Sequence, residues 1–361
     1  MKKTLCIVFF LISNWLYSQS SDRFTVKGVS INTNNNEFGT VISNDGGIFY
    51  SKSTYKNQMD LGELSSSLYK GEILSKGEIS KGLKFPTDAI HAVFTNDGGT
   101  VYYSKKEGDK FQLYKAQVDN TGRWKNNIKL LFNDPNFNFK QPALNKDNTK
   151  LFFVSDKSDT FGSTDIYYVI ITNRGLNFSD PIHLNFYVNT PGEEIFPHIG
   201  DLDKLYFSSD GMSGLGGLDI FESFYNNGAY ENTANLGEPI NSEFDDFAFT
   251  LISNNYKGFF SSNRNGGSGG VDIYYFEDKK PTLNKCSKSL SGFVKNKENQ
   301  KPIAEATVEM FDSNGNNENT LTDDTGAFVF DNVECEATYD IVSYKEGFNG
   351  IAEVHTSPLN T

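Results

Sequence analysis

Cysteine, tryptophan and histidine are scarce in this chain of 361 residues, which contains three cysteines, two tryptophans and four histidines. The histidines, His91, His183, His198 and His355, are widely separated in the sequence. Because no H-E-x-x-H motif joins them, a structural role for each is a better prediction than a metal site. The G-x-G-x-x-G turn of dinucleotide-binding proteins is also absent, and the stretch Gly211-Met-Ser213-Gly-Leu misses the G-x-S-x-G motif of hydrolases at its last position. We therefore expect no catalytic residue, no metal and no cofactor.

Long apolar runs are lacking too, and the run Leu5–Ile12 near the start is too short to span a bilayer. It follows Lys2-Lys3 and precedes small residues at Ser18-Gln19-Ser20, which is the pattern of a signal peptide. We predict a signal peptide at residues 1–19, an exported protein and no transmembrane span.

Basic residues are outnumbered, with 33 lysines and arginines against 46 aspartates and glutamates and a formal net charge of −13. A surface this acidic repels phosphate backbones, so nucleic acid is excluded as an expected partner.

Aromatic residues and glycine are abundant, and they follow a repeat. A strand ending in an aromatic residue recurs about every 50 residues, as expected of a repeat architecture, at Tyr50, Tyr103, Phe153, Phe207 and Phe260. A turn rich in Asn, Asp and Gly precedes each copy, as in SNDGG at 43–47 and TNDGG at 95–99. Five copies of a β-hairpin are therefore predicted.

The second strand of the hairpin opens on an aspartate in three copies, at Asp165, Asp219 and Asp272. Gln112 and Asp60 take the corresponding place in two degenerate copies. With an outer strand and an inward strand added, each copy has four short strands, the pattern of a β-propeller blade. We expect outer strands within Leu184–Asn189 and Leu236–Asn241.

The fifth copy lacks an outer strand of its own, because a charged linker starts at Glu277. The segment Phe24–Phe38 has the pattern of an outer strand, so we predict that it completes the last blade and removes the open edge. The prediction is a five-bladed β-propeller over residues 20–278.

The stretches FSSDGMSGLGGLDIF (207–221) and FSSNRNGGSGGVDIYYF (260–276) resemble the WD-like propeller repeats of the TolB type. The motif GG-(L/V)-D-I-(Y/F) resembles that of OmpA-family cell-envelope proteins of Bacteroidetes-type bacteria. The resemblance implies envelope or outer-membrane proteins as partners, and a link to the type IX secretion apparatus. Such proteins usually continue into an OmpA-type peptidoglycan-binding domain, which is not found before Thr361. Contact with peptidoglycan is thus expected only through a domain that this chain lacks.

After a linker at 279–287, short alternating strands predict a small β-sandwich over residues 288–361. Leu290–Val294, Ala306–Phe311 and Thr322–Phe330 resemble the carboxypeptidase regulatory-like, or transthyretin-like, domain. Cys286 and Cys335 are predicted to form a structural disulfide in the exported protein, because a core this small gains from a crosslink. The fold class expected for the whole chain is all-β.

The repeated carboxylates could suggest calcium, but one aspartate per copy at the start of a strand better fits a turn or inter-blade hydrogen-bonding residue. Asp165, Asp219 and Asp272 are therefore predicted to be structural, and Arg264 is predicted to pair with one of them. The pairs Glu193-Glu194 and Asp245-Asp246 are expected to form solvated rims.

The segment Ser43–Tyr50 fits the S-x-D-x-G-x-x-aromatic box of sialidase propellers. The same pattern arises in ordinary propeller hairpins, and the arginines Arg23, Arg123, Arg174 and Arg264 do not follow the repeat. We expect a non-catalytic binding or scaffold protein in the periplasm or at the periplasmic face of the outer membrane. The alternative is a glycan-active or carbohydrate-binding propeller protein.

Overall fold

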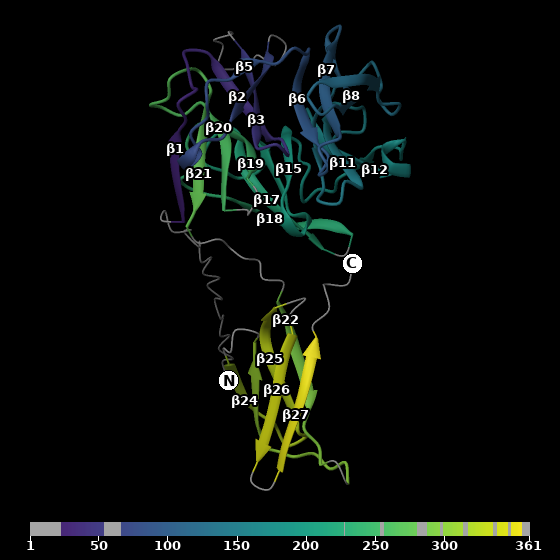
Figure 1. Cartoon of the computed structure of the whole chain (residues 1–361), viewed down its shortest axis with the longest axis vertical. Coiled ribbons are helices and arrows are strands. Elements are labelled where there is room, and N and C mark those ends of the chain that lie inside the picture. Colours follow the sequence, from purple (N-terminus) through teal and green to yellow (C-terminus); the bar gives the residue numbers. More distant parts are fainter. Residues whose placement is uncertain are drawn as a thin grey trace, which may run out of the picture. The chain divides into compact units, whose positions relative to one another are not determined.

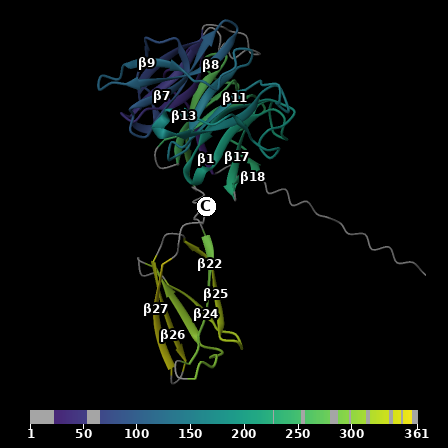
Figure 2. The ribbon, with the colours of Figure 1, turned by 90° about the vertical axis from the view of Figure 1, so that its right-hand side faces the viewer.

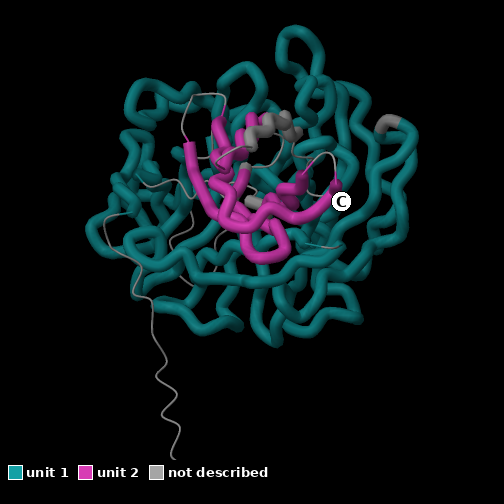
Figure 3. The backbone as a smooth tube through the Cα atoms, turned by 90° about the horizontal axis from the view of Figure 1, so that it is seen from below, with its two compact units in different colours: residues 1–280 teal, residues 281–361 magenta. Residues whose placement is uncertain are grey.

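The chain is all-β and divides into two compact units, residues 1–280 and 281–361, which are coloured separately in Figure 3. The computed structural model describes residues 23–53, 66–226, 228–252, 256–279, 287–296, 299–312, 317–334, 338–345 and 348–355. The predicted signal peptide, most of the linker, and both Cys286 and Cys335 lie outside the described residues. Each unit is described by itself.

The described part of the first unit contains five antiparallel sheets, numbered in chain order (Figure 1). Sheet 1 comprises β2 (Asn36–Ile42), β3 (Gly47–Ser53), β4 (Ser67–Glu72) and β5 (Leu83–Lys84). Sheet 2 comprises β6 (Ala89–Phe94), β7 (Thr100–Glu107), β8 (Lys110–Val118) and β9 (Trp124–Lys129). Sheet 3 comprises β10 (Phe139–Leu144), β11 (Lys150–Ser155), β12 (Asp165–Thr172), β13 (Asn177–Phe178) and β14 (Ile182–His183).

Sheet 4 comprises β15 (Glu194–Ile199), β16 (Leu205–Ser209), β17 (Asp219–Asn226) and β18 (Ala229–Asn235). Short 3-10 turns connect some of these strands: η2 (Ser75–Gly77), η3 (Asn173–Gly175) and η4 (Asp201–Asp203). Outer strands were expected within Leu184–Asn189 and Leu236–Asn241, but β14 and β18 both end just before these stretches. The two stretches form turns instead, because each is folded back by an asparagine that bonds to the backbone.

Sheet 5 joins the two ends of the first unit. It comprises β19 (Asp246–Leu251), β20 (Lys257–Ser262) and β21 (Asp272–Asp278), followed by β1 (Phe24–Gly28) at its outer edge. Val26 lies opposite Phe276 in this antiparallel pair. Residues from opposite ends of the unit therefore share one sheet, and β1 covers the edge that β21 would expose.

The sheets are arranged around a centre as in a β-propeller. The first strands, β2, β6, β10, β15 and β19, contact one another in cyclic order, β19 returning to β2. Aromatic and aliphatic side chains fill the space between consecutive sheets, for example Phe49 and Val101 between sheets 1 and 2, and Phe249 and Ile220 between sheets 4 and 5. Burial of these faces supplies the main stabilising term for a ring whose sheets share few backbone bonds.

A repeated asparagine ties the connection between sheets to the third strand. The Asn189 amide accepts a hydrogen bond from Ile166 N (2.9 Å) and donates to Ile166 O and Leu184 O (both 3.0 Å). Asn32, Asn133 and Asn241 make the same paired bonds to the backbone of Ile273, Leu113 and Ile220. Each asparagine thus satisfies backbone groups at the end of a strand ladder.

The second unit has two sheets in its described part (Figures 1 and 2). One pairs β22 (Ser287–Phe293) with β25 (Ala327–Glu334). The other has the order β24 (Asn317–Leu321), β23 (Thr307–Phe311), β26 (Thr338–Lys345) and β27 (Phe348–His355). Val308, Met310, Phe330, Tyr339 and Ile341 are buried among its core residues.

Replacing Asn189 with alanine should destabilise the first unit. The change removes the partner of Ile166 N and one bond each to Ile166 O and Leu184 O, of which Ile166 O keeps its bond from Leu184 N. Each unsatisfied group costs about 1–3 kcal/mol, so we expect the free energy of unfolding to fall by about 2–5 kcal/mol. Urea unfolding monitored by the fluorescence of Trp124 measures this. The control Asn120→Ala changes an exposed residue and should shift stability by less than about 0.5 kcal/mol. Equal effects of the two substitutions would contradict the assignment.

Candidate functional site

The first strand of every sheet contains a shift in its pairing register. The shift lies between Phe38 and Val41 in β2 and at the corresponding places in β10, β15 and β19, whereas in β6 it lies between Ala89 and His91, at the start of the strand. Four of the shifts contain a residue with positive φ: Gly39 (65°), Gln141 (54°), Phe196 (52°) and Ala248 (55°). Left-handed backbone is strained for residues other than glycine, and such strain collects at functional sites. The convergence of these bulges marks the centre of the ring as the candidate site.

Hydrogen bonds between neighbouring sheets hold the bulges in place. Gly39 N donates to Ser261 Oγ (3.1 Å), and Gln141 N donates to Ser104 Oγ (2.9 Å). In sheet 3 the corresponding second-strand position is Val154, which has no hydroxyl. In sheet 3 the Gln141 side chain replaces the serine hydroxyl as the acceptor for the neighbouring bulge, because its Oε1 accepts a hydrogen bond from Phe196 N (2.9 Å).

A cavity of about 150 Å³ lies inside the ring of bulges, lined by residues 39–42, 91–94, 141–144, 196–199 and 248–251. All of these residues are aliphatic, aromatic, proline, glycine or neutral polar, apart from two histidines. Pockets for drug-sized ligands hold about 300–1,000 Å³, so this cavity suits a much smaller group.

Thr40, Thr250 and His198 are three of the five polar side chains that line the cavity. Thr250 Oγ1 donates to Thr40 O (2.7 Å), whereas Thr40 Oγ1 is buried with no hydrogen-bond partner among the described residues. His198 Nε2 accepts from Leu251 N (3.2 Å), and burial lowers the pKa of His198 to about 4. The interior therefore holds this imidazole neutral at pH 7 and disfavours positive charge.

His91 also lines the cavity and contacts the edge of Phe196, with ring centroids 5.3 Å apart. Two of the four histidines thus converge at one site although they are far apart in sequence. No cluster of three or more possible metal ligands occurs in the part of the chain that the structure describes.

Turns surround the mouth of the cavity, because each lining stretch ends where a turn between the first and second strands begins. Asn44 Nδ2 donates to Asn96 O, and Asn96 Nδ2 donates to Lys146 O. Lys146 Nζ in turn lies 3.2 Å from Asp201 Oδ1. This chain of bonds links the turns of sheets 1 to 4 into a rim.

Carboxylates dominate this rim. Asp45, Asp97, Asp147 and Asp201 are exposed on it. Asp45 Oδ1 accepts from Gly47 N (3.1 Å) and Ser43 Oγ (2.5 Å), so the sialidase-like box forms an ordinary turn here. The Thr95 hydroxyl and the backbone of Gly99 likewise lower the pKa of Asp97, which keeps that carboxylate charged.

The repeat aspartates all bind the glycine-rich turn that precedes them. Asp165 accepts from Phe161 N (2.7 Å) and Gly162 N (3.3 Å), and Asp272 from Ser268 N (2.6 Å) and Gly269 N (3.1 Å). Asp219 likewise accepts from Leu215 N and Gly216 N. The structure places these aspartates apart from one another, at equivalent points of sheets 3, 4 and 5.

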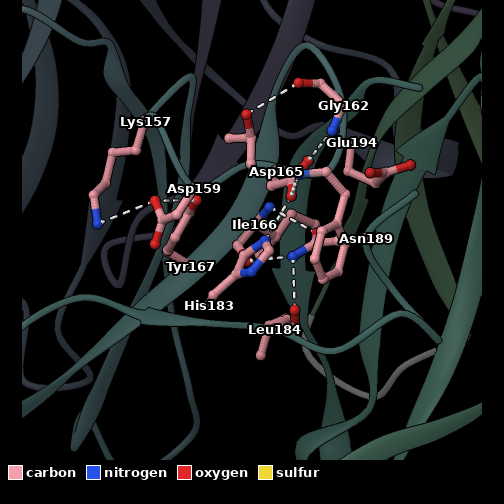
Figure 4. A network of polar contacts seen from close by, with 12 residues as sticks. Lys157, Asp159, Gly162, Asp165, Ile166, Tyr167, His183, Leu184, Asn189 and Glu194 are labelled. Carbon is pink, nitrogen blue, oxygen red and sulfur yellow. Dashed lines mark hydrogen bonds and ion pairs between the residues drawn. The ribbon is translucent and has the colours of Figure 1, made fainter. Parts of the chain in front are cut away.

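Sheet 3 differs from the others in carrying a histidine on its repeat aspartate (Figure 4). His183 Nε2 lies 2.5 Å from Asp165 Oδ2, and its ring stacks on Tyr167 with centroids 4.6 Å apart. Tyr167 OH bonds to Asp159 (3.0 Å), which lies 3.4 Å from Lys157. In sheet 4 Asn235 takes the place of His183 beside Asp219. The network joins the turn and strands of one sheet.

Two predictions about charged residues are wrong. Glu194 and Asp246 were expected on solvated rims but are fully buried, because each opens a central strand at the interface with the preceding sheet. Arg264 pairs with Asp246 (Nη2 to Oδ1, 2.5 Å) rather than with Asp165, Asp219 or Asp272. Burial raises the pKa of Asp246 although Arg264 opposes it.

These buried acids belong to a second repeated motif that the sequence analysis missed. Thr190 N and Oγ1 donate to Glu194 (2.7 and 2.6 Å), and Ser242 bonds in the same way to Asp246. Thr33 repeats the arrangement with Glu37, which also pairs with Lys52 (2.7 Å). The visible signal was the spacing Asn-(Ser/Thr)-x₃-(Glu/Asp) at 32–37, 189–194 and 241–246.

Comparison with known proteins supports the assignment of the second unit. Residues 289–358 match the family model of the carboxypeptidase regulatory-like domain. No curated protein matches the chain. In the described residues no helix is long and apolar enough to cross a membrane.

Solved structures similar to the chain include propeller proteins at low identity. TolB from Acinetobacter baumannii is 13% identical with a TM-score of 0.38, over 68% of this chain and 55% of that one, so the chain spans about half of its length. A protein described as TolB from Agrobacterium tumefaciens is 13% identical with a TM-score of 0.41, over 86% of this chain and 98% of that one. A thermostable family-43 glycoside hydrolase is 14% identical with a TM-score of 0.46, over 70% of this chain and 96% of that one.

Replacing Arg264 with methionine should destabilise the first unit by about 3–5 kcal/mol, because it leaves the buried Asp246 carboxylate uncompensated. Adding Asp246→Asn should recover part of this loss, and a double-mutant cycle in urea measures the coupling. The exposed pair Lys146–Asp201, changed to methionine and asparagine, serves as the control and should show coupling below about 1 kcal/mol. Equal coupling for both pairs would contradict the role of burial.

Replacing Glu194 with glutamine should flatten the pH dependence of stability. Burial raises the pKa of Glu194 above its ordinary value of 4.5. As the pH rises above 4.5, the unfolded chain loses this proton first, so the free energy of unfolding falls until the folded glutamate also ionises. Glu194→Gln should remove a slope of up to ~1.4 kcal/mol per pH unit in that window.

Urea unfolding between pH 4.5 and 7 measures the slope, with the neighbour Glu193→Gln as the control. Unchanged slopes in the Glu194 variant would show that this carboxyl does not carry the effect.

Proposed function

We propose that this chain is a non-catalytic binding protein that scaffolds other proteins in the cell envelope. The observation that carries the proposal is the neutral lining of the central cavity, inside a rim of hydrogen-bonded turns. Glycoside hydrolysis commonly needs a pair of carboxylic acids flanking the scissile bond. The carboxylates of the first unit instead support turns and sheet interfaces, at Asp45, Glu194 and Asp246.

In this proposed function, each of the five sheets forms one blade of a five-bladed propeller. The cyclic contacts of the central strands and the pairing of β1 with β21 support this count. A ring that is closed by its own first strand presents rigid faces. Rigid faces suit the binding of protein or peptide partners.

The site of action proposed is the periplasm or the periplasmic face of the outer membrane, which the leader-like residues 1–19 support. The resemblance of the repeat motif to that of OmpA-family proteins supports an association with envelope assemblies, including the type IX secretion apparatus. The second unit, which matches the carboxypeptidase regulatory-like family model, adds a compact β-domain to the protein.

The alternative is a carbohydrate-binding or glycan-active propeller. Exposed aromatic side chains favour it, in particular the adjacent Phe186 and Tyr187, which are 69% and 48% exposed with ring centroids 4.5 Å apart. Aromatic faces of this kind can stack on sugar rings.

The test combines in-cell crosslinking of the full chain with glycan binding and hydrolysis assays on the purified protein. We expect one or more reproducible protein partners from the envelope fraction, no glycan turnover and no glycan affinity. Hydrolysis of a glycan by the purified protein would overturn the scaffold function. So would glycan binding that Phe186→Ala abolishes, if crosslinking also finds no protein partner. A chain recovered only in the cytoplasm would overturn the location.

A further inference from the structure

We infer that the central cavity and its rim bind a basic polypeptide segment, which inserts one tyrosine side chain into the cavity. This inference rests on the proposed binding function and deepens it by naming the chemistry of the partner. It is carried by the size of the cavity, one buried hydroxyl and the charge of the turns around the mouth.

The size of the cavity limits the inserted group to about one ring. An apolar cavity of about 150 Å³ in a protein core is known to bind benzene. The cavity here has the same volume and carries Phe196, Pro142 and Pro197 among its lining residues. A phenyl or phenol ring fits this space, whereas a sugar chain or a nucleotide is too large.

The interior chemistry selects a neutral ring that carries a hydrogen-bonding group. His198 is held neutral by burial, so a lysine or arginine side chain would enter only at a high desolvation cost. Thr40 lines the cavity, is only 6% exposed, and its hydroxyl has no partner among the described residues. A buried hydroxyl without a partner is costly, and a phenol that enters beside it can donate or accept the missing bond.

The rim requires the rest of the ligand to be a positively charged chain. Exposed Asp97 and Asp147 lie on adjacent turns and form no ion pair among the described residues. The flanking Asp45 and Asp201 are paired with Lys70 (2.7 Å) and Lys146 (3.2 Å). The Thr95 hydroxyl helps to keep Asp97 ionised at neutral pH. The uncompensated charges of Asp97 and Asp147 lie on the turns of two neighbouring sheets, outside the space that holds the ring, so basic residues that flank the inserted side chain complement them.

The test uses short capped peptides with the full chain. Lys-Tyr-Lys is compared with Lys-Phe-Lys, Lys-Ala-Lys and Glu-Tyr-Glu, and p-cresol alone is included, with dissociation constants measured by NMR titration at low salt. We expect Lys-Tyr-Lys to bind most tightly, Lys-Phe-Lys about 2- to 10-fold more weakly, and the other three ligands weaker still. Thr40→Val keeps the shape of the side chain and should abolish the preference for tyrosine over phenylalanine while leaving Lys-Phe-Lys unchanged.

The rim is tested with the double variant Asp97→Asn and Asp147→Asn, in which each amide oxygen can still accept the turn bonds. We expect Lys-Tyr-Lys to bind about 3- to 10-fold more weakly and its dependence on salt to decrease. The matched control is Asp109→Asn with Asp134→Asn, which removes two carboxylates at the strand ends opposite the rim, one between β7 and β8 and one between β9 and β10. This control should leave binding unchanged.

Equal affinity of Lys-Tyr-Lys and Glu-Tyr-Glu, equal loss in the rim and control variants, or binding of p-cresol as tight as that of the peptide would overturn the inference. If crosslinking finds protein partners whose capture is unaffected by Thr40→Val and by the rim variant, this inference fails while the scaffold function stands. If no protein partner is found and glycans bind instead, the proposed function itself fails.

Discussion

The interlocking of one sheet with the next at the central bulges is the constraint on which the rest of the first unit depends. Gly39 N bonds to Ser261 of the preceding sheet, and Gln141 N bonds to Ser104. Without these bonds, the strained residues at the ring centre would leave buried backbone groups unsatisfied, and strained backbone persists only where its surroundings over-determine it. Each of these bonds holds the cavity-lining stretch of one sheet against its neighbouring sheet.

A second set of interactions stabilises the opposite ends of the central strands. Glu37, Glu194 and Asp246 are fully buried, and each accepts bonds from the threonine or serine four residues earlier. Lys52 and Arg264 compensate two of these acids. Removal of a carboxylate from water is costly, so these positions commit the chain to one arrangement of neighbouring sheets. The ring is therefore built from polar contacts at both ends and apolar packing between them.

The repeat and rim carboxylates accept hydrogen bonds from turn amides, whereas the residues that line the cavity include no carboxylate. Asp165, Asp219 and Asp272 each satisfy the amides of a glycine-rich turn, and Asp45 and Asp97 do so at the rim. The centre keeps a neutral interior, with His198 uncharged. Under the proposed function, these acidic turns and the neutral cavity together recognise a partner.

The sequence by itself determined the all-β class, the period of the repeat and the second unit, because alternating strands and Asn-Asp-Gly turns are local signals. It also pointed to an N-terminal strand at the edge of the last sheet, where β1 is found beside β21. It misplaced Glu194 and Asp246 on the surface, because neighbouring acids in a polar stretch look solvated until the next sheet covers them. Only the tertiary structure decided that His91 and His198 meet at one cavity and that Thr40 is buried there. Those residues come from different sheets, and no spacing within one strand records which side chains face the centre of a ring.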